Sequence, residues 1–286
     1  MPADIKARPS GNDDARAKKM QELFSRIEAG VSGVFTNDNY RSYLRTMAKF
    51  HRYSARNCLL IHFQRPEATM VAGFDAWKKK FHRHVLAGET GITIIGYALK
   101  SSTLKKPLRD EKGDPVIGDD GKPAIEYVKH SYPVYFPVYV YDVSQTEGEP
   151  LPQLVHDLEG DVASYQDFLA SCRKLSPYPI EFENIASPNV RGYCSFEEQR
   201  IVVRSGLSQV QTAKTVLHEL THAILHNEGD AKTRAEKELE AESAAFVICS
   251  HYGIDTSEYT FPYLASWCRQ ERDKLERCLD AIQKHA

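Results

Sequence analysis

One helical segment near the C-terminus constrains this 286-residue chain more than any other stretch. From Ser208 to about His226 apolar residues recur at helical spacing, and positions 218–222 read His-Glu-Leu-Thr-His. Residues four apart on a helix lie on the same face, so both imidazoles can reach one metal ion. The other faces of this helix are apolar. The chain must therefore bury the helix in a core and bring a further ligand to it from another element.

The residue types of this motif favour hydrolytic zinc chemistry. His218 and His222 are expected as zinc ligands, and Glu219 can point at a water on the ion. Zinc lowers the pKa of such a water toward ~7, and a carboxylate takes its proton during attack on a carbonyl. We therefore expect a zinc metallopeptidase with Glu219 as its catalytic base.

The third ligand is expected from the next helix, predicted over residues 233–252. It begins with glutamates, of which Glu238 and Glu242 lie one turn apart and continue the face that becomes apolar. We expect Glu238 as the third ligand and Glu242 as the partner of a ligand histidine, with the reverse assignment as an alternative. A solvated acidic helix start is a second alternative. Glu236 and Glu240 are expected to project elsewhere, and His226 to cap the helix or face solvent.

Hydrophobic periodicity predicts an α+β fold in two domains. The expected order is a disordered segment 1–14, a first domain 15–145 with helices followed by a small antiparallel sheet, a linker 146–155, and a minimal zincin domain 156–286. Residues 101–125 are expected to form an exposed hairpin tip or loop, and a cleft along strand 201–204 is expected to accept an extended peptide. The expected helices are 15–30, 37–51, 55–64, 74–81, 165–175, 208–226, 233–252 and 261–284, and the expected strands 91–97, 132–143, 180–182, 192–194 and 200–204.

Composition and hydropathy indicate the cellular compartment of the protein. No stretch approaches the ~20 apolar residues that span a bilayer, and the first residues lack the apolar segment of a secretory signal. The six cysteines contain no Cys-x-x-Cys pair, which is typical of free thiols in a reducing compartment. We expect a cytosolic protein without a membrane partner; nothing in the sequence indicates an oligomeric state.

The charge is unevenly distributed although the net charge is only −2. Residues 1–142 hold 23 Lys and Arg against 16 Asp and Glu, a net charge of +7, and the remainder carries −9. Basic residues are densest from Arg41 to Arg83, and aromatic residues are interleaved with them. Such a pattern can neutralise phosphates and stack on the bases of a single strand, with a solvated helix face and core packing as the alternatives.

Two stretches resemble a known family. The block from Tyr53 to Ile61, with Gln64-Arg65-Pro66, Trp77 and Gly88 to Ile92, resembles the N-terminal domain of ArdC-type antirestriction proteins. HELTHAILH followed by ELEAES is similar to the zincin-like metallopeptidase domain often fused to it. The resemblance implies a single-stranded DNA-binding domain joined to a zincin domain, on mobile or phage-derived elements. The candidate DNA-binding residues are Arg52, Tyr53, Ser54, Arg56, Asn57, Arg65, Trp77, Lys78 and Arg83.

Three functions are compatible with this sequence. The first is a single-stranded DNA-binding protein with a zinc peptidase domain. In the second the protein is an antirestriction DNA-binding protein whose zinc is structural, so that Glu219 is dispensable. The third is a general cytosolic zinc peptidase whose basic region is only a solvated surface.

Overall fold

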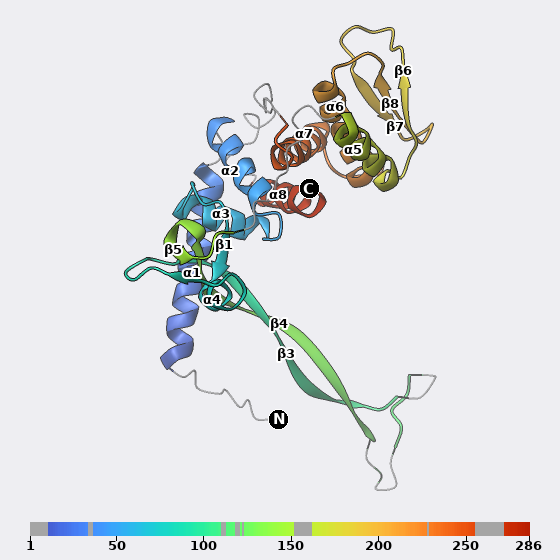
Figure 1. The fold of residues 1–286 in the computed structure, drawn as a ribbon. Coiled ribbons are helices and arrows are strands. Elements are labelled where there is room, and N and C mark those ends of the chain that lie inside the picture. Colours follow the sequence, from blue (N-terminus) through green and yellow to red (C-terminus); the bar gives the residue numbers. More distant parts are fainter. Residues whose placement is uncertain are drawn as a thin grey trace. The chain divides into compact units, whose positions relative to one another are not determined.

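The computed structural model describes residues 11–33, 37–109, 113–117, 121, 123–151, 162–227, 229–254 and 272–286. Helices and small sheets alternate along them, which confirms the expected α+β class (Figure 1). The chain forms two compact units, Met1–Gln21 with Ile95–Val138 and Glu22–Ile94 with Tyr139–Ala286. The predicted division into domains 15–145 and 156–286 rests on sequence patterns and not on contacts, and it stays a prediction.

The helices of the N-terminal part begin and end close to where their sequence patterns predict. They are α1 (Gly11–Gly33), α2 (Asn37–Lys49), α3 (Ala55–Gln64) and α4 (Phe74–Lys80). Ser54 caps α3, because its side chain accepts a hydrogen bond from the Asn57 backbone N–H. Residues 1–10 of the segment expected to be disordered lie outside the described residues, and its last four residues belong to α1.

Five strands of the N-terminal part form two small sheets. In the first, β4 (Ile125–Asp142) lies between β1 (Val71–Gly73) and β3 (Ile92–Pro107). In the second, β2 (Arg83–Val85) pairs antiparallel with β5 (Thr146–Gly148), so the segment expected as a linker begins with a strand.

β3 and β4 are longer than predicted. β3 continues to Pro107 and β4 starts at Ile125, so the loop expected over 101–125 is shorter. The reason is that most side chains in the outer half of both strands are exposed, which removes the alternation of apolar and polar residues that marks a half-buried strand. Pro133 and Pro137 are tolerated in β4 because β1 pairs only with Val140 to Asp142, which leaves the proline-containing part with β3 alone as its neighbour.

The C-terminal part places a three-stranded sheet beside two long helices. In this sheet β8 (Arg200–Arg204) is the central strand, parallel to β6 (Ile180–Glu183) and antiparallel to β7 (Gly192–Ser195). Ile201, Val202 and Val203 of the central strand are fully buried. The elements are α5 (Val162–Leu175), β6 (Ile180–Glu183), β7 (Gly192–Ser195), β8 (Arg200–Arg204), α6 (Gln209–Leu225), α7 (Arg234–His251) and α8 (Arg272–His285).

The N-terminal helices pack directly on α7 and α8. The Tyr40 hydroxyl of α2 lies 2.8 Å from Ser243 Oγ of α7, and both residues are buried. On α3, the Arg56 guanidinium donates to Glu276 of α8 at 3.1 Å. Helices from opposite ends of the sequence thus share one core.

Two negative observations concern only the residues given above. None of their helices combines the length and apolar character that crossing a membrane requires. The cysteines among them are free thiols, namely Cys58, Cys172, Cys194, Cys249 and Cys278, and Cys268 lies outside this part of the chain.

One buried carboxylate joins β4 to the turn before β1. Asp142 is 2% exposed; its Oδ1 accepts hydrogen bonds from the backbone N–H groups of Thr69 and Met70. Its Oδ2 accepts from the N–H and the hydroxyl of Ser144, capping the 3-10 turn η1 (Val143–Gln145). Burial alone would raise the pKa of Asp142, but these hydrogen bonds outweigh it and hold the pKa below its ordinary value.

We predict that Asp142→Asn destabilises the fold by about 1–3 kcal/mol, because an amide nitrogen would face an N–H group. Since the folded-state pKa is depressed, the stability that Asp142 contributes is present above its unfolded-state pKa of about 3.9 and is lost as the pH falls through the folded-state value. Urea denaturation from pH 7 to pH 2 measures both effects. Asp75→Asn is the control, because Asp75 is 80% exposed; equal losses in the two variants would contradict the prediction.

Candidate metal centre

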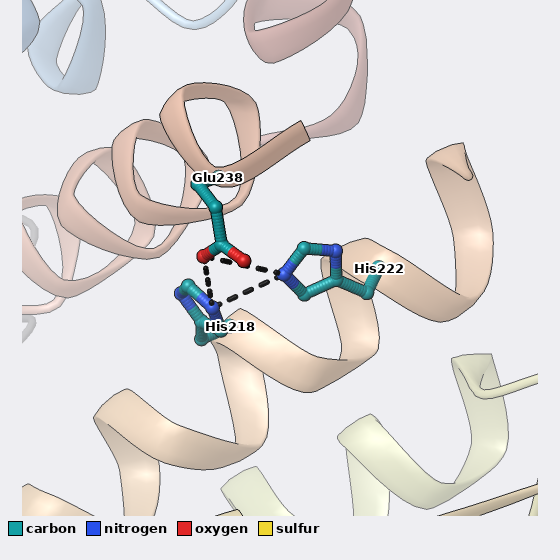
Figure 2. Close-up of side chains that lie close together, drawn as sticks. All are labelled: His218, His222 and Glu238. Atoms are coloured by element: carbon teal, nitrogen blue, oxygen red, sulfur yellow. Dashed lines mark hydrogen bonds and ion pairs between the residues drawn. The ribbon is translucent and has the colours of Figure 1, made fainter. Parts of the chain in front are cut away.

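The helix α6 brings two histidines to one face and buries most of the remainder. Ser208 caps it by accepting a hydrogen bond from the Gln211 N–H, as the sequence predicted. The Nε2 atoms of His218 and His222 lie 3.1 Å apart. Glu238, from the first turns of α7, points its carboxylate between them (Figure 2).

The three side chains have the spacing that a small divalent cation requires. Glu238 Oε2 lies 3.5 Å from His218 Nε2 and 3.9 Å from His222 Nε2. Tetrahedral ligands bound at about 2.0–2.1 Å lie roughly 3.3 Å apart, close to the observed distances. Among the described residues, these three form the group of histidine, cysteine and acidic side chains that could hold a metal ion.

Glu242 contacts the far side of His218. Its Oε2 lies 3.1 Å from His218 Nδ1, one helical turn beyond Glu238, so the two carboxylates occupy opposite nitrogens of one ring. Burial lowers the pKa of His218, but the hydrogen bonds with Glu238 and Glu242 outweigh burial and raise it to about 10. A cation between His218 and Glu238 would replace that proton, so metal binding competes with protonation.

His226 and Glu240 form a matching support for His222. His226 Nδ1 lies 2.9 Å from His222 Nδ1, and His226 Nε2 lies 2.9 Å from Glu240 Oε2. Lys232 donates to the same Glu240 oxygen at 2.7 Å. His226 is the C-cap of α6, one of the two roles expected for it, but the expectation that it faces solvent is wrong. Glu240 is not one of the three candidate ligands, as expected, yet it is not solvated: the side chains of both residues are at most 1% exposed.

This arrangement determines which nitrogen carries each proton once a metal is bound. If His222 uses Nε2 as the ligand atom, its Nδ1 carries hydrogen and donates to His226 Nδ1, whose Nε2–H then donates to the Glu240 carboxylate. His218 likewise donates from Nδ1 to Glu242. Each candidate ligand histidine would therefore have its ring orientation and tautomer fixed by a second side chain. The i,i+4 spacing of His226 from His222 is the sequence signal for this support.

Glu219 lies beside the centre in a mostly buried position, 9% exposed. Burial raises the pKa of Glu219 to about 7, and the charge of His218 opposes this while that of Glu238 adds to it. A hydrogen bond with the Cys194 backbone of β7 holds the side chain. A carboxylate with a pKa near neutrality can both accept and return a proton.

A cleft of about 420 Å³ opens onto His218, Glu219 and Glu242. One wall is the segment 189–192, which leads into β7. The expected cleft along strand 201–204 is therefore misplaced, because β8 is paired on both sides and β7 forms the sheet edge near the site. Gly192 permits this close approach, since a Cβ there would lie 2.6 Å from Thr215 Cγ2 and 2.9 Å from Val202 O.

Several of the candidate DNA-binding residues have structural roles. Trp77 is fully buried and donates from Nε1 to Tyr141 O, so its ring is not available to a base. Asn57 is buried on α3, and Ser54 is the helix cap. Tyr53 is partly buried and donates its hydroxyl hydrogen bond to Val71 O. The aromatic residue Phe63, in contrast, is 47% exposed.

The basic candidates divide into paired and exposed side chains. Arg83 makes four hydrogen bonds to residues 146–149 of β5 and its end. Arg65 contacts Glu67, Glu89 and Ser144, and Arg56 pairs with Glu276 while remaining half exposed. Arg52 and Lys78 are exposed. The structure does not gather the nine candidates into one surface.

Two family models match separate parts of the chain. Residues 13–141 match the N-terminal domain of the anti-restriction factor ArdC. Residues 177–261, which contain α6 and Glu238, match the IrrE N-terminal-like domain, a model named for peptidase family M78.

Comparisons over most of the chain give one relative and two solved structures. An uncharacterised protein of Bacillus anthracis is 26% identical over 293 residues, covering 94% of this chain and 50% of that protein, so the chain spans about half the length of this curated relative. The metal-free crystal structure of the antirestriction protein ArdC from plasmid R388 is similar in fold, with a TM-score of 0.51, 20% identity and 82% of each chain covered. Its Mn(II)-bound structure gives a TM-score of 0.46 with 16% identity, covering 93% of this chain and 97% of that chain.

We predict that His226→Ala lowers the affinity for a divalent metal by about 10- to 100-fold, because His222 loses the group that orients it. The variant should also lose about 2 kcal/mol of stability, since Glu240 stays buried with one partner fewer. Chelator competition measures the first effect and urea denaturation of metal-free protein the second. His84→Ala is the control, because His84 is exposed on β2. If the variant is less stable but binds the metal with unchanged affinity, His226 contributes only to the stability of the fold and the prediction is wrong.

Proposed function

The chain belongs to the ArdC-like family, and on that premise we propose that it is a single-stranded DNA-binding protein with a zinc-dependent peptidase domain. Its biological setting would be antirestriction on a mobile or phage-derived element, as the family resemblance implies. The observation that carries the peptidase half is the convergence of His218, His222 and Glu238 beside Glu219 on an open cleft.

We assign the metal as zinc, with His218, His222 and Glu238 as its ligands. Two imidazoles and one carboxylate are a typical ligand set of catalytic zinc, which leaves one coordination position for water or substrate. Glu242 and the pair His226–Glu240 then orient the two histidines.

Zinc at this centre would supply Lewis acidity, polarising a peptide carbonyl and lowering the pKa of a water molecule. Glu219 would accept the proton of the attacking water and pass it to the leaving amine, for which its raised pKa is suited. The edge of β7 would hold the peptide as an added strand along the cleft, with Gly192 keeping the backbone close to Glu219.

The DNA-binding half rests on charge. Residues 1–142 carry a net charge of +7, which attracts a polyanion, and the strongly acidic composition of a DNA mimic is absent. Exposed Arg52 and Lys78 remain candidates for phosphate contacts.

Glu219→Gln separates catalysis from a structural role of the metal. We expect this variant to keep its zinc content and its affinity for single-stranded DNA but to lose about 10²-fold or more of peptidase activity, because the amide cannot accept the proton. Zinc analysis, strand binding and cleavage of a casein-derived peptide library measure the three properties. Antirestriction activity that survives the change would instead favour the alternative in which zinc only holds α6 and α7 together.

The two carboxylates of α7 are distinguished by comparing Glu238→Ala with Glu242→Ala. We expect Glu238→Ala to lose stoichiometric zinc, whereas Glu242→Ala should retain zinc with an affinity reduced by about 10- to 100-fold. Metal analysis after dialysis against a weak chelator measures both. Loss of zinc from Glu242→Ala alone would reverse the assignment.

A further inference from the structure

We propose that one face of the β3–β4 strand pair is the surface on which a single DNA strand binds, by stacking of tyrosines on bases and pairing of lysines with phosphates. The inference rests on the proposed DNA-binding function and assigns to it a surface outside the block from Arg41 to Arg83. Both strands run side by side from the sheet that they share with β1 (Figure 1). The relevant residues lie in one compact unit, Ile95–Val138 with the start of α1.

Two cross-strand contacts define this face. The rings of Tyr97 and Tyr135 have centroids 6.4 Å apart, and Lys105 Nζ lies 5.7 Å from the centroid of the Tyr127 ring. Each contact joins β3 to β4, and the two are eight residues apart on both strands, so the register is constant between them. Because side chains alternate between the faces of a strand, Leu99 and Lys129 lie on the same face. We call Tyr97, Leu99, Lys105, Tyr127, Lys129 and Tyr135 the tyrosine face.

The tyrosine face is open to solvent. Tyr97 is 67% exposed, Tyr127 65% and Tyr135 57%, and Leu99 is equally uncovered at 69%. The opposite face is covered near its base: Arg16, Ala17 and Met20 of α1 line a pocket with Ala98 and Phe136, and Tyr135 also borders this pocket while staying 57% exposed. A helix thus packs on one side of the strands, while large aromatic side chains remain uncovered on the other.

The charges of the tyrosine face complement a polyanion. Its ionisable groups other than tyrosine are lysines. β3 and β4 contain two acidic residues: Asp142 is buried, and Glu126 lies on the opposite face because side chains alternate along the strand. Lys105 Nζ lies over one face of the Tyr127 ring, so a base stacked on the other face would have a cation within reach of its phosphate. Ser101, Thr103 and Ser131 separate the rings, which makes the face polar between its aromatic positions. This alternation suits stacked bases better than the continuous apolar surface of a protein interface.

The spacing of the rings fits an extended strand. Eight residues of a β-strand span on the order of 27 Å, which separates the Tyr97–Tyr135 pair from Tyr127. Sites of this kind cover roughly 4–16 nucleotides, and tyrosine stacks on any base because every base has an aromatic face. The surface therefore fits a single strand without demanding a particular sequence.

The test uses the full chain and fluorescein-labelled dT20 in anisotropy titrations. The triple variant Tyr97→Ala, Tyr127→Ala, Tyr135→Ala should bind about 100-fold more weakly, because loss of one stacking ring costs roughly 5- to 150-fold. The corresponding triple Tyr→Phe variant should bind within about threefold of the wild type, since it keeps the rings. Circular dichroism and thermal melting verify that these exposed substitutions leave the fold intact.

The lysines are tested through salt dependence. Lys105→Gln with Lys129→Gln should reduce the slope of log K against log salt by about 0.7 for each phosphate that the variant no longer neutralises. The matched control is His130→Ala with Tyr132→Ala, because these residues alternate onto the opposite face and also form a stacked pair. This control should bind dT20 within about twofold of the wild type.

The outcomes separate this inference from the proposed function. If the wild type binds dT20 and the triple Tyr→Ala variant binds equally well, the tyrosine face is not the site, while the DNA-binding proposal survives. If Arg52→Gln with Lys78→Gln alone abolishes binding, the site lies on the N-terminal helices. A wild type without affinity for dT20 at 50 mM salt overturns both proposals. A tenfold or greater preference for rU20 overturns DNA as the occupant.

Discussion

The contact between α6 and α7 is the interaction on which the rest of the structure depends. α6 supplies His218 and His222, and a catalytic zinc centre of this kind needs a third protein ligand from another element. α7 does so with Glu238 and, one turn later, supports His218 through Glu242. From Leu239 onward most of its side chains are buried, and the Ser243 hydroxyl lies against that of Tyr40 on α2. A single helix therefore determines both the geometry of the candidate ligands and the packing of α2.

Buried charge explains why this contact is specific. Glu240 is 1% exposed, and a carboxylate in that position is destabilising unless it is paired and hydrogen-bonded. It receives two donors, His226 and Lys232. A shift of α7 along α6 would separate this carboxylate from His226 at the same time as it moved Glu238 away from the histidines. The support of His222 and the register of the two helices thus rest on the same hydrogen bonds.

Sequence patterns predicted the local structure better than the long-range contacts. The helices α2, α3, α6 and α7 follow from apolar periodicity and from caps such as Ser54 and Ser208. The role of Glu240 could not be predicted, because an acidic helix start is usually solvated and its partner His226 belongs to another helix. Trp77 shows the same limit: a tryptophan among lysines suggests a stacking platform, yet its hydrogen-bond acceptor is Tyr141, 64 residues away.

The distribution of positive charge illustrates why composition alone does not locate a binding surface. Within the basic block, Arg83 is hydrogen-bonded to β5 and Arg65 pairs with Glu67 and Glu89, so part of the positive charge there stabilises the fold. On the tyrosine face the charge is sparser, but Lys105 stands beside an exposed ring. What a polyanion encounters is the charge left after internal pairing, together with the rings that remain uncovered. By that measure the long strands, whose outer halves carried little secondary-structure signal, present the more accessible surface.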